Sequence, residues 1–289
     1  MIKEDAFAKL NLNLHIIPKK SKNGFFPIRF LNCQLDLKDE ILFESQKEHV
    51  VFFCDDKNVP KRNNNLVERA ALLLKKMASD QNLGAKITLK KRIPIKAGFG
   101  GGSTDAAATV KGLLKLWKLK INEKKLEELT SKLGQDFFYS YYGKLSQFEG
   151  EDNKYRIIPF PFRLPDFKML IVEPKDKKPS SAWMYDHLNI KKIGQNIQKL
   201  SLLKNAIREN NREAIFENLH NDFEDLVFSF YPVTKKIKDD LTNAGARRSL
   251  LAGAGLSVVG FFDNEQAAQS AKQKLKNKYK QVIITKPIS

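Results

Sequence analysis

The chain has 289 residues, of which 42% are hydrophobic and 29% charged, a composition that predicts about two folded domains and excludes a disordered or fibrous chain. Cys33 and Cys54 are too few for a disulfide framework or a cysteine-rich metal site, and both are expected to be reduced. The apolar runs are far shorter than the ~18 residues of a membrane span, and no signal-type segment follows Met1. We therefore expect a cytoplasmic protein.

Lysine and arginine number 51 against 33 aspartates and glutamates, which gives a formal net charge of +18. The basic residues form short pairs and triplets along the whole chain, without the single basic stripe of a nucleic-acid reader. We interpret most of this excess as a lysine-rich solvated surface, and a nucleic-acid partner is not expected. The positive field would still favour a phosphorylated small substrate.

Alternating apolar and polar residues at positions 7–16 predict a half-buried strand. One side of this strand would carry Leu10, Leu12, Leu14 and Ile16, and the other side Lys9, Asn11, Asn13 and His15. Further strands are predicted at 30–37, 41–44, 50–54 and 87–89, with a turn at Asp39 and Glu40. Asn65 is placed to cap a helix that ends near Met77. The N-terminal part of the chain therefore begins as sheet.

The strongest local signal lies at residues 94–108, where four of the five positions from 98 to 102 are glycine and an amphipathic helix follows. Ser103 or Thr104 is predicted to cap this helix, with Asp105 in its first turn. Glycines that open a helix supply free backbone amides and the positive end of the helix dipole, so the segment predicts a cradle for phosphate. No lysine follows the glycines, and Ser103 replaces the last glycine of the dinucleotide pattern, so neither of the two commonest phosphate loops is predicted.

A second helix is predicted at 122–133, and after residues 148–152 the composition turns to loop. Pro159, Pro161 and Pro165 break regular structure, so we place a domain boundary near Tyr155. The two predicted domains span residues 1–155 and 156–289. The second is expected to be α+β, with strands at 168–173, 256–262 and 281–285, helices within 193–228 and a helix at 264–276.

Residues 94–107, Pro-Ile-Lys-Ala-Gly-Phe-Gly-Gly-Gly-Ser-Thr-Asp-Ala-Ala, closely resemble the ATP-binding loop of the GHMP kinase superfamily, whose pattern is P-x-x-x-G-L-G-G-G-S-S-D-A-A. Residues 8–14 and 253–257 resemble the first and third motifs of that superfamily, so the resemblance spans residues 6 to about 262. It implies an α+β, two-domain GHMP kinase fold, with ATP and substrate in the cleft between the domains. It also implies an ATP-dependent kinase, with Mg²⁺ entering together with ATP.

By this resemblance, the residues expected to bind ATP are Asn65, Pro94, Lys96, Gly98, Phe99, Gly100, Gly101, Gly102, Ser103 and Thr104. No protein metal site is expected, because His15, His49, His187 and His220 have neither metal-ligand spacing nor nearby cysteines. The Mg²⁺ would use phosphate oxygens and the hydroxyl of Ser103 or Thr104.

Within the superfamily, residues 23–28, 64–67 and 133–136 look most like the branch that phosphorylates a hydroxyl of a CDP-linked polyol, 4-diphosphocytidyl-2-C-methyl-D-erythritol, for isoprenoid precursors. That resemblance implies Lys9 and Asp136 as catalytic residues. It implies contacts to a diphosphate-bearing small substrate from Asn11, Phe25, Phe26, Ser181 and Tyr185. Phe26 departs from the branch, which has a histidine there to read cytosine. Ala252 and Ala254 replace hydroxyl-bearing residues of the third motif.

The chemistry of phosphoryl transfer independently favours these assignments, because it needs chiefly a carboxylate to accept the proton of the hydroxyl and a cation beside it. Two alternatives stay open. The chain could phosphorylate another small alcohol of the mevalonate or sugar type, since Phe26 removes a polar base-reading group. It could also be a non-catalytic polyanion binder on a kinase scaffold, although Lys9, Asp136 and the glycine loop argue against lost catalysis. The sequence leaves the oligomeric state open.

Overall fold

The computed structural model describes residues 1–22, 24–78, 82–152 and 154–288. Asn23, the first residue of the 23–28 segment, lies outside the described residues. The strands are β1 (Ile2–Ile16), β2 (Ile28–Lys47), β3 (Val50–Cys54), β4 (Leu83–Lys90), β5 (Ser146–Glu151), β6 (Lys154–Pro159), β7 (Lys168–Glu173), β8 (His220–Asn221), β9 (Arg248–Leu251), β10 (Val258–Phe262) and β11 (Gln281–Thr285). The helices are α1 (Leu66–Met77), α2 (Gly101–Leu116), α3 (Glu123–Leu133), α4 (Gln135–Tyr142), α5 (Ser181–Asp186), α6 (Gln198–Arg208), α7 (Arg212–Glu217), α8 (Glu224–Phe230), α9 (Pro232–Asn243) and α10 (Glu265–Leu275).

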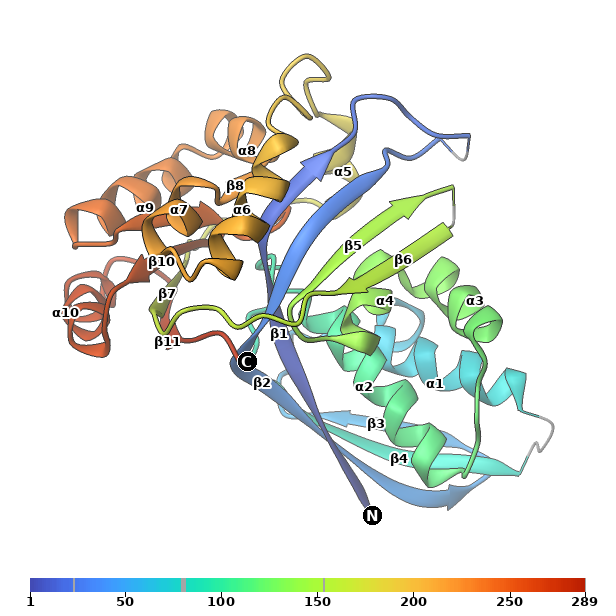
Figure 1. Cartoon of the computed structure of the whole chain (residues 1–289). Helices are drawn as coiled ribbons and strands as arrows, with labels where there is room; N and C mark the ends of the chain where they lie inside the picture. The colour runs from blue at the N-terminus through green and yellow to red at the C-terminus, as the bar shows by residue number, and fades with distance from the viewer. Residues whose placement is uncertain (23, 79–81, 153, 289) are drawn as a thin grey trace.

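The larger sheet is built around the two long strands β1 and β2, which pair antiparallel along most of their length. The sheet order is β3-β4-β2-β1-β8, and the other edge of β2 is shared: β5 pairs with its first part and β4 with its last part. Residues 286–288 lie along β2 in the gap between β5 and β4. The Asp36 amide donates a hydrogen bond to the Lys286 carbonyl, and the Ile288 amide donates one to the Gln34 carbonyl. In Figure 1, β1 and β2 run between the two halves of the molecule.

Helices α1 to α4 lie together on one side of β1 and β2, and the C-terminal elements lie on the other (Figure 1). The C-terminal half has its own antiparallel sheet, in the order β11-β7-β10-β9, against which α9 and α10 pack. Strand β1 contributes to more than one core: Leu10 and Leu12 pack in a cluster with β7 and α6, whereas Leu14 and Ile16 pack in a cluster with α2 and α4. The sheet of the N-terminal half therefore forms the wall that both halves share.

Several predicted elements are confirmed, among them the strands at 168–173 and 281–285 and the helix after Asn65. The turn at Asp39 and Glu40 is wrong, because β2 continues through both residues. Asp39 is fully buried, and its carboxylate accepts hydrogen bonds from the Lys91 ammonium and the Ile93 backbone amide. Of the two acidic residues that suggested a turn, Asp39 thus forms a buried ion pair with Lys91.

Two further predictions about strands are wrong. Strand β1 is buried on both faces from Ala8 onward rather than half-buried. The C-terminal half packs on Leu10 and Leu12 of the predicted apolar side and also contacts Asn13 and His15 of the predicted polar side. The segment expected to be loop after residue 152 contains β6, which pairs with β5 along its length. The domain boundary placed near Tyr155 falls inside β6, and the division of the chain at that point stays a prediction.

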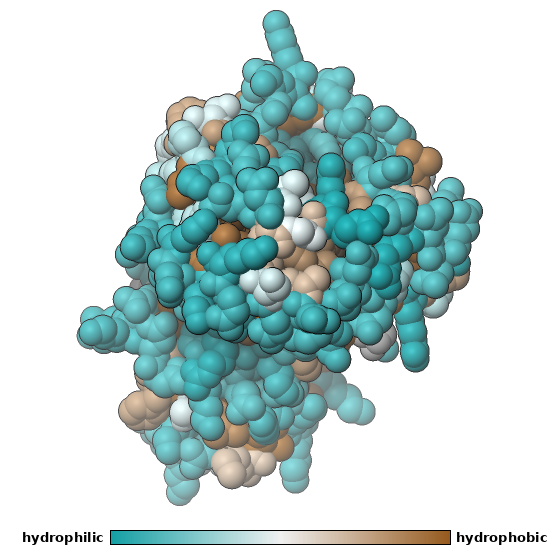
Figure 2. Space-filling view, turned by 90° about the vertical axis from the view of Figure 1, so that its left-hand side faces the viewer, coloured by the Kyte–Doolittle hydropathy of each residue, from teal (hydrophilic) through white to brown (hydrophobic). Residues whose placement is uncertain are grey.

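Hydrophilic side chains cover most of the face seen in Figure 2, and apolar residues there gather in small, separate groups. This agrees with a lysine-rich solvated surface. None of the helices in the described parts of the chain combines the length and the apolar character that a membrane crossing requires.

Candidate active site

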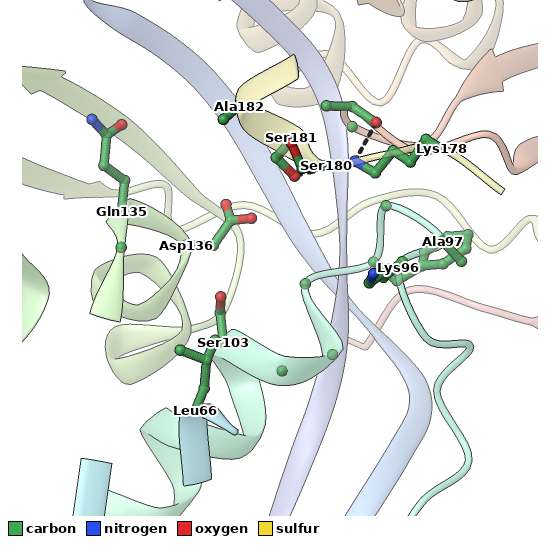
Figure 3. Close-up of a pocket in the computed structure, with 18 of the residues that line it drawn as sticks. Leu66, Lys96, Ala97, Ser103, Gln135, Asp136, Lys178, Ser180, Ser181 and Ala182 are labelled. Carbon is green, nitrogen blue, oxygen red and sulfur yellow. Dashed lines mark hydrogen bonds between the residues drawn. The ribbon is translucent and has the colours of Figure 1, made fainter. Parts of the chain in front are cut away.

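A cavity of about 730 Å³ lies where β1, the glycine loop and the N-terminus of α4 meet the segments 178–186 and 253–254. Its size is in the usual range for ligand sites. It is lined by every residue predicted for the site from the sequence except Thr104. Residues from both halves of the chain therefore converge on one space (Figure 3).

Lys9 is the buried cation of this site. Its ammonium lies 2.8 Å from Asn11 Oδ1 and 3.6 Å from Asp136 Oδ2. Two irregularities in the β1–β2 register flank Lys9 and Asn11, one between Phe7 and Lys9 and one between Asn11 and Asn13. Such irregularities change the direction of side chains and leave backbone groups without a partner in the neighbouring strand. Here the Lys9 amide bonds to the carbonyl of Phe99, 3.0 Å away, which ties the strand to the glycine loop.

Asn32 of β2 completes this polar chain and was not predicted from the sequence. Its fully buried Oδ1 accepts a hydrogen bond from Asn11 Nδ2 at 2.6 Å, so the amide of Asn11 is held between Lys9 and Asn32. The signal available in the sequence was a polar residue in the middle of an apolar strand, because a buried amide requires partners.

Asp136 lies in the first turn of α4, a helix that the sequence analysis did not predict. Gly134, with φ of 101°, lets the chain turn directly from α3 into α4. The Asp136 side chain is 40% exposed, whereas that of Lys9 is 4% exposed. In Figure 3 the carboxylate points into the space above Ser103, and Gln135 points away from it. The arrangement leaves Asp136 accessible to a ligand while Lys9 holds it from behind.

The glycine loop ends in α2, which begins at Gly101 with Gly100 as its N-cap in the left-handed conformation, φ 67°. The predicted cap at Ser103 or Thr104 is therefore wrong. The Thr104 hydroxyl donates instead to the carbonyl of Phe7, 2.9 Å away, and is buried outside the cavity. It is not available to a ligand or a metal ion, whereas Ser103 lines the cavity.

Close packing explains why glycine is needed in this loop. A Cβ on Gly100 would lie 3.0 Å from the Lys9 side chain, and one on Gly101 would lie 3.0 Å from Lys91 Nζ. The loop also packs against the start of a second glycine segment, residues 252–257, because a Cβ on Gly98 would lie 1.8 Å from the carbonyl oxygen of Ala252. Gly100, Gly101 and Gly102 line the cavity at the start of α2 and bring no side chain into it, as a phosphate cradle at a helix N-terminus requires.

A buried ion network supports the loop from below, and the sequence analysis missed its central residue, Lys91. The Lys91 ammonium lies 2.5 Å from Asp39 and 2.6 Å from Asp105. Asp105 was expected in the first turn of the helix, facing the dipole, but it lies one turn further on and turns inward. Burial raises the pKa of Asp105, against the lowering effect of the Lys91 ammonium.

The other end of the cavity is lined by aromatic residues. Phe25 is 68% exposed, and Phe26 is 8% exposed with the Lys20 ammonium 5.4 Å from its ring centre. Tyr185 of α5 packs edge-on against Phe223, and burial raises its pKa. Asn65 lines the cavity, but its side chain caps α1 and donates to the carbonyl of Pro60. Its polar atoms therefore serve the helix.

In the described part of the chain, one group of side chains has donor atoms close enough for a metal ion: His15, His220 and Asp222, within 4.8 Å of one another. The two imidazoles are stacked, with centroids 4.9 Å apart and planes 21° apart. Lone pairs in nearly parallel planes do not converge on one point. Asp222 also accepts hydrogen bonds from His220 and from the backbone amides of Ile16 and Gly194. This group ties the two halves together away from the cavity.

Two family models match the chain, the GHMP kinases N terminal domain over residues 65–144 and GHMP kinases C terminal over residues 202–281. The fold and the glycine loop are thus those of a GHMP kinase, as expected from the sequence. A 4-diphosphocytidyl-2-C-methyl-D-erythritol kinase of Acetivibrio thermocellus is 33% identical over 284 residues, 98% of either chain. The same enzyme of Thermoanaerobacter pseudethanolicus is 34% identical over 99% of this chain and 96% of its own. The chain belongs to the 4-diphosphocytidyl-2-C-methyl-D-erythritol kinase family of GHMP kinases.

Solved structures agree with this fold. A 4-(cytidine 5'-diphospho)-2C-methyl-D-erythritol kinase superposes with a TM-score of 0.81 at 23% identity, covering 100% of both chains. The mevalonate kinase of L. major in complex with R-mevalonate has a TM-score of 0.76 at 14% identity, covering 99% of this chain and 96% of its own. At these identities the likeness concerns the fold alone.

Proposed function

We propose that this kinase transfers the γ-phosphoryl group of ATP to the 2-hydroxyl of 4-diphosphocytidyl-2-C-methyl-D-erythritol. Relatives with that activity in their names match almost the whole chain. The observation that carries the proposal is the pair Lys9 and Asp136, 3.6 Å apart beside the N-terminus of α2. Phosphoryl transfer depends mainly on positioning and charge neutralisation, and this pair and the helix amides supply both.

In the proposed reaction, the acceptor hydroxyl oxygen attacks the γ-phosphorus. The bond from phosphorus to the bridging oxygen breaks, ADP leaves with the electron pair, and the hydroxyl proton passes to the carboxylate of Asp136. Lys9 stabilises negative charge on the acceptor oxygen and keeps Asp136 oriented. Asn11, fixed between Lys9 and Asn32, is placed to hold the polyol. Glycines 100 to 102 leave the amides of α2 open to the phosphates.

Mg²⁺ enters with ATP in this proposal. It prefers oxygen ligands, and the cavity offers the Ser103 hydroxyl, which points into the space shared with Asp136 (Figure 3). The Thr104 hydroxyl is excluded by its bond to Phe7. When bound with ATP, the ion would neutralise charge on the β- and γ-phosphates.

The aromatic end of the cavity is proposed to hold the cytidine. Phe25, Phe26 and Tyr185 offer ring surface for stacking a base. Phe26 has no polar side-chain atom, which is the specific observation that favours the second candidate, a kinase for a smaller alcohol without a base. A cytoplasmic location and a small-molecule partner that carries a diphosphate belong to the same proposal.

The test is a coupled ADP-release assay with the CDP-linked polyol, mevalonate and homoserine as acceptors. We expect turnover with the CDP-linked polyol to exceed that with the other two by at least about 10²-fold in kcat/KM, because only this acceptor fills both ends of the cavity. Preferred use of mevalonate or homoserine would contradict the proposed substrate. Absence of turnover with all three would contradict this substrate and favour the polyanion-binding alternative.

A further inference from the structure

A second lysine reaches the reaction centre from the C-terminal half. Lys178 precedes α5, in the segment that lies opposite Asp136 in Figure 3. Its ammonium donates to the carbonyl of Ala254 at 2.5 Å and to Ser181 Oγ at 3.1 Å. An ammonium has three donors, and these two bonds leave one N–H unpaired with any group of the described residues. The Lys178 side chain is therefore held in place and still has one hydrogen-bond donor to offer a ligand.

The Ala254 carbonyl that accepts from Lys178 belongs to the second glycine segment, residues 252–257. This segment packs closely against Lys9, Asn11 and the glycine loop. A Cβ on Gly253 would lie 3.4 Å from Lys9 Nζ and 3.2 Å from Asn11 Oδ1, and one on Gly255 would lie 2.3 Å from the carbonyl of Ala97. Backbone therefore touches backbone where the two glycine segments meet. Lys178 is anchored to this junction, so its position is set by both halves of the site.

The charges that act on Lys178 come from the acceptor side and from the ATP side of the cavity. Burial lowers its pKa to about 8, with Lys9 and Lys96 lowering it further and Asp136 raising it. Lys9 lies on β1, Asp136 on α4 and Lys96 in the glycine loop, which are the elements that face this side chain across the cavity. Placing three cations near one carboxylate is unfavourable without an anion, so the arrangement favours a strongly negative guest.

We infer that the Lys178 ammonium binds the phosphoryl group during its transfer, between the oxygens of ATP and of the acceptor. This inference rests on the proposed function, because it assigns a contact for the same reaction. A fixed cation at that point stabilises charge on the equatorial oxygens of the transition state more than on bound substrates. It would also take the place of the hydroxyl groups that Ala252 and Ala254 do not supply in the neighbouring segment.

The first test compares Lys178→Gln with the wild type and with Lys177→Gln, which removes the same charge from the exposed neighbouring residue. We expect Lys178→Gln to lower kcat by about 10- to 100-fold, with KM for ATP and for the acceptor within about threefold. Lys177→Gln should keep wild-type values. Thermal unfolding midpoints within a few degrees of wild type would show that the loss is not one of folding.

The second test uses pH. The profile of kcat/KM reports groups of the free enzyme, so the wild type should lose activity above about pH 8, as Lys178 loses its proton. Arginine stays charged, so Lys178→Arg should move this decline upward by at least one pH unit while recovering part of the activity. An unchanged decline in Lys178→Arg, or a Lys178→Gln enzyme within twofold of wild type, would overturn the inference.

Failure of the inference is distinguishable from failure of the proposed function. If the wild type uses another alcohol, the proposed acceptor is wrong, but the Lys178 comparison is made with that alcohol and the same expectations hold. If the wild type uses the CDP-linked polyol and Lys178→Gln is as active, the acceptor stands and the role of Lys178 falls.

Discussion

The two ends of the cavity are built in different ways. At the reaction end, Lys9, Asn11 and Asn32 are buried and linked by hydrogen bonds, and the glycine loop is packed so closely that added Cβ atoms would collide. At the aromatic end, Phe25 is largely exposed and Phe26 offers only ring surface. The first end is fixed before any ligand arrives, whereas Phe25 and Phe26 of the second end lie in the connection between β1 and β2.

This difference indicates where tolerance to substitution should be found. Preorganised groups stabilise charge in the transition state without reorganising, so a small displacement there has a large effect on rate. Stacking surfaces are less demanding, because ring area serves several bases. Substitutions at the reaction end should therefore change kcat strongly, and those at the aromatic end should change acceptor preference weakly.

The largest effect is expected at Asp136. Asp136→Asn keeps the shape of the side chain but removes the proton acceptor, so kcat should fall by ~10²-fold or more with little change in the affinity for either substrate. Lys9→Met, which keeps most of the buried volume, should behave alike. Steady-state kinetics with the CDP-linked polyol and ATP measure both effects.

The control is Asp186→Asn, which removes another carboxylate from the rim of the same cavity without touching Lys9. Its kcat should stay within about threefold of wild type. Wild-type turnover by Asp136→Asn would remove that residue from the chemistry and would break the contrast between the two ends of the cavity.

The next effect concerns the floor of the phosphate cradle. In Gly101→Val the new side chain would meet Lys91 Nζ at 3.0 Å and Ile93 Cγ2 at 3.1 Å, so the first turn of α2 must move. Its amides would then no longer converge on the phosphates, and we expect KM for ATP to rise by about tenfold or more. Gly101→Ala should give a smaller increase in the same direction. Unchanged ATP affinity in a folded Gly101→Val would separate the loop from the nucleotide site.

The glycine loop was the part of the site that could be predicted best, because glycine content and the start of a helix are local properties of the sequence. Lys9 and Asp136 could be assigned as a catalytic pair only through the family resemblance. Alternation placed Lys9 and Asn11 on one face of a strand, but nothing local places Asp136, more than a hundred residues later, 3.6 Å from Lys9. This long-range pairing depends on how α4 packs against α2 and on how α2 packs against β1.

The errors have a common physical cause. Asp39 and Asp105 were interpreted by local preference, as a turn residue and as a residue of the first helical turn. Both are instead partners of Lys91 in the interior, where an ion pair outweighs local preference. Lys178 was missed for a similar reason: its role depends on the carbonyl of Ala254, which lies 76 residues away. A lysine inside a lysine-rich segment carries no sequence signal of burial.

A smaller effect is expected at Asn32, and it should distinguish binding of the acceptor from the chemical step. Asn32→Ala removes the acceptor of the 2.6 Å hydrogen bond from Asn11, and Asn32 itself does not line the cavity. A lost neutral hydrogen bond costs ~0.5–1.5 kcal/mol, so kcat/KM for the acceptor should fall by about two- to tenfold while KM for ATP stays unchanged. Isothermal titration with each ligand separates the two. An equal loss of affinity for ATP would mean that Asn32 supports the whole cleft rather than Asn11.

The smallest effect is expected at Phe26, and it concerns how the cytosine is read. The Phe26 side chain has no hydrogen-bonding atom, but its backbone N–H and C=O make no hydrogen bond with the residues that the structure describes. A backbone donor and acceptor beside a stacked ring can distinguish cytosine from uracil, whose polar groups are reversed at that edge. We expect the wild type to prefer the cytidine substrate over its uridine form by about tenfold in kcat/KM, since a mispaired base loses hydrogen bonds of ~0.5–1.5 kcal/mol each.

The comparison is completed by Phe26→His, which adds a polar side chain at the position where a histidine was expected from the family resemblance. If the backbone reads the base, the preference for cytidine should change by less than about threefold, because the backbone groups keep their place in the histidine variant. The measurement is kcat/KM for both nucleotide forms in both enzymes. Equal use of cytidine and uridine by the wild type would leave stacking as the sole contact with the base. It would also shift weight toward an acceptor without a base, which is the outcome that most directly opposes the proposed substrate.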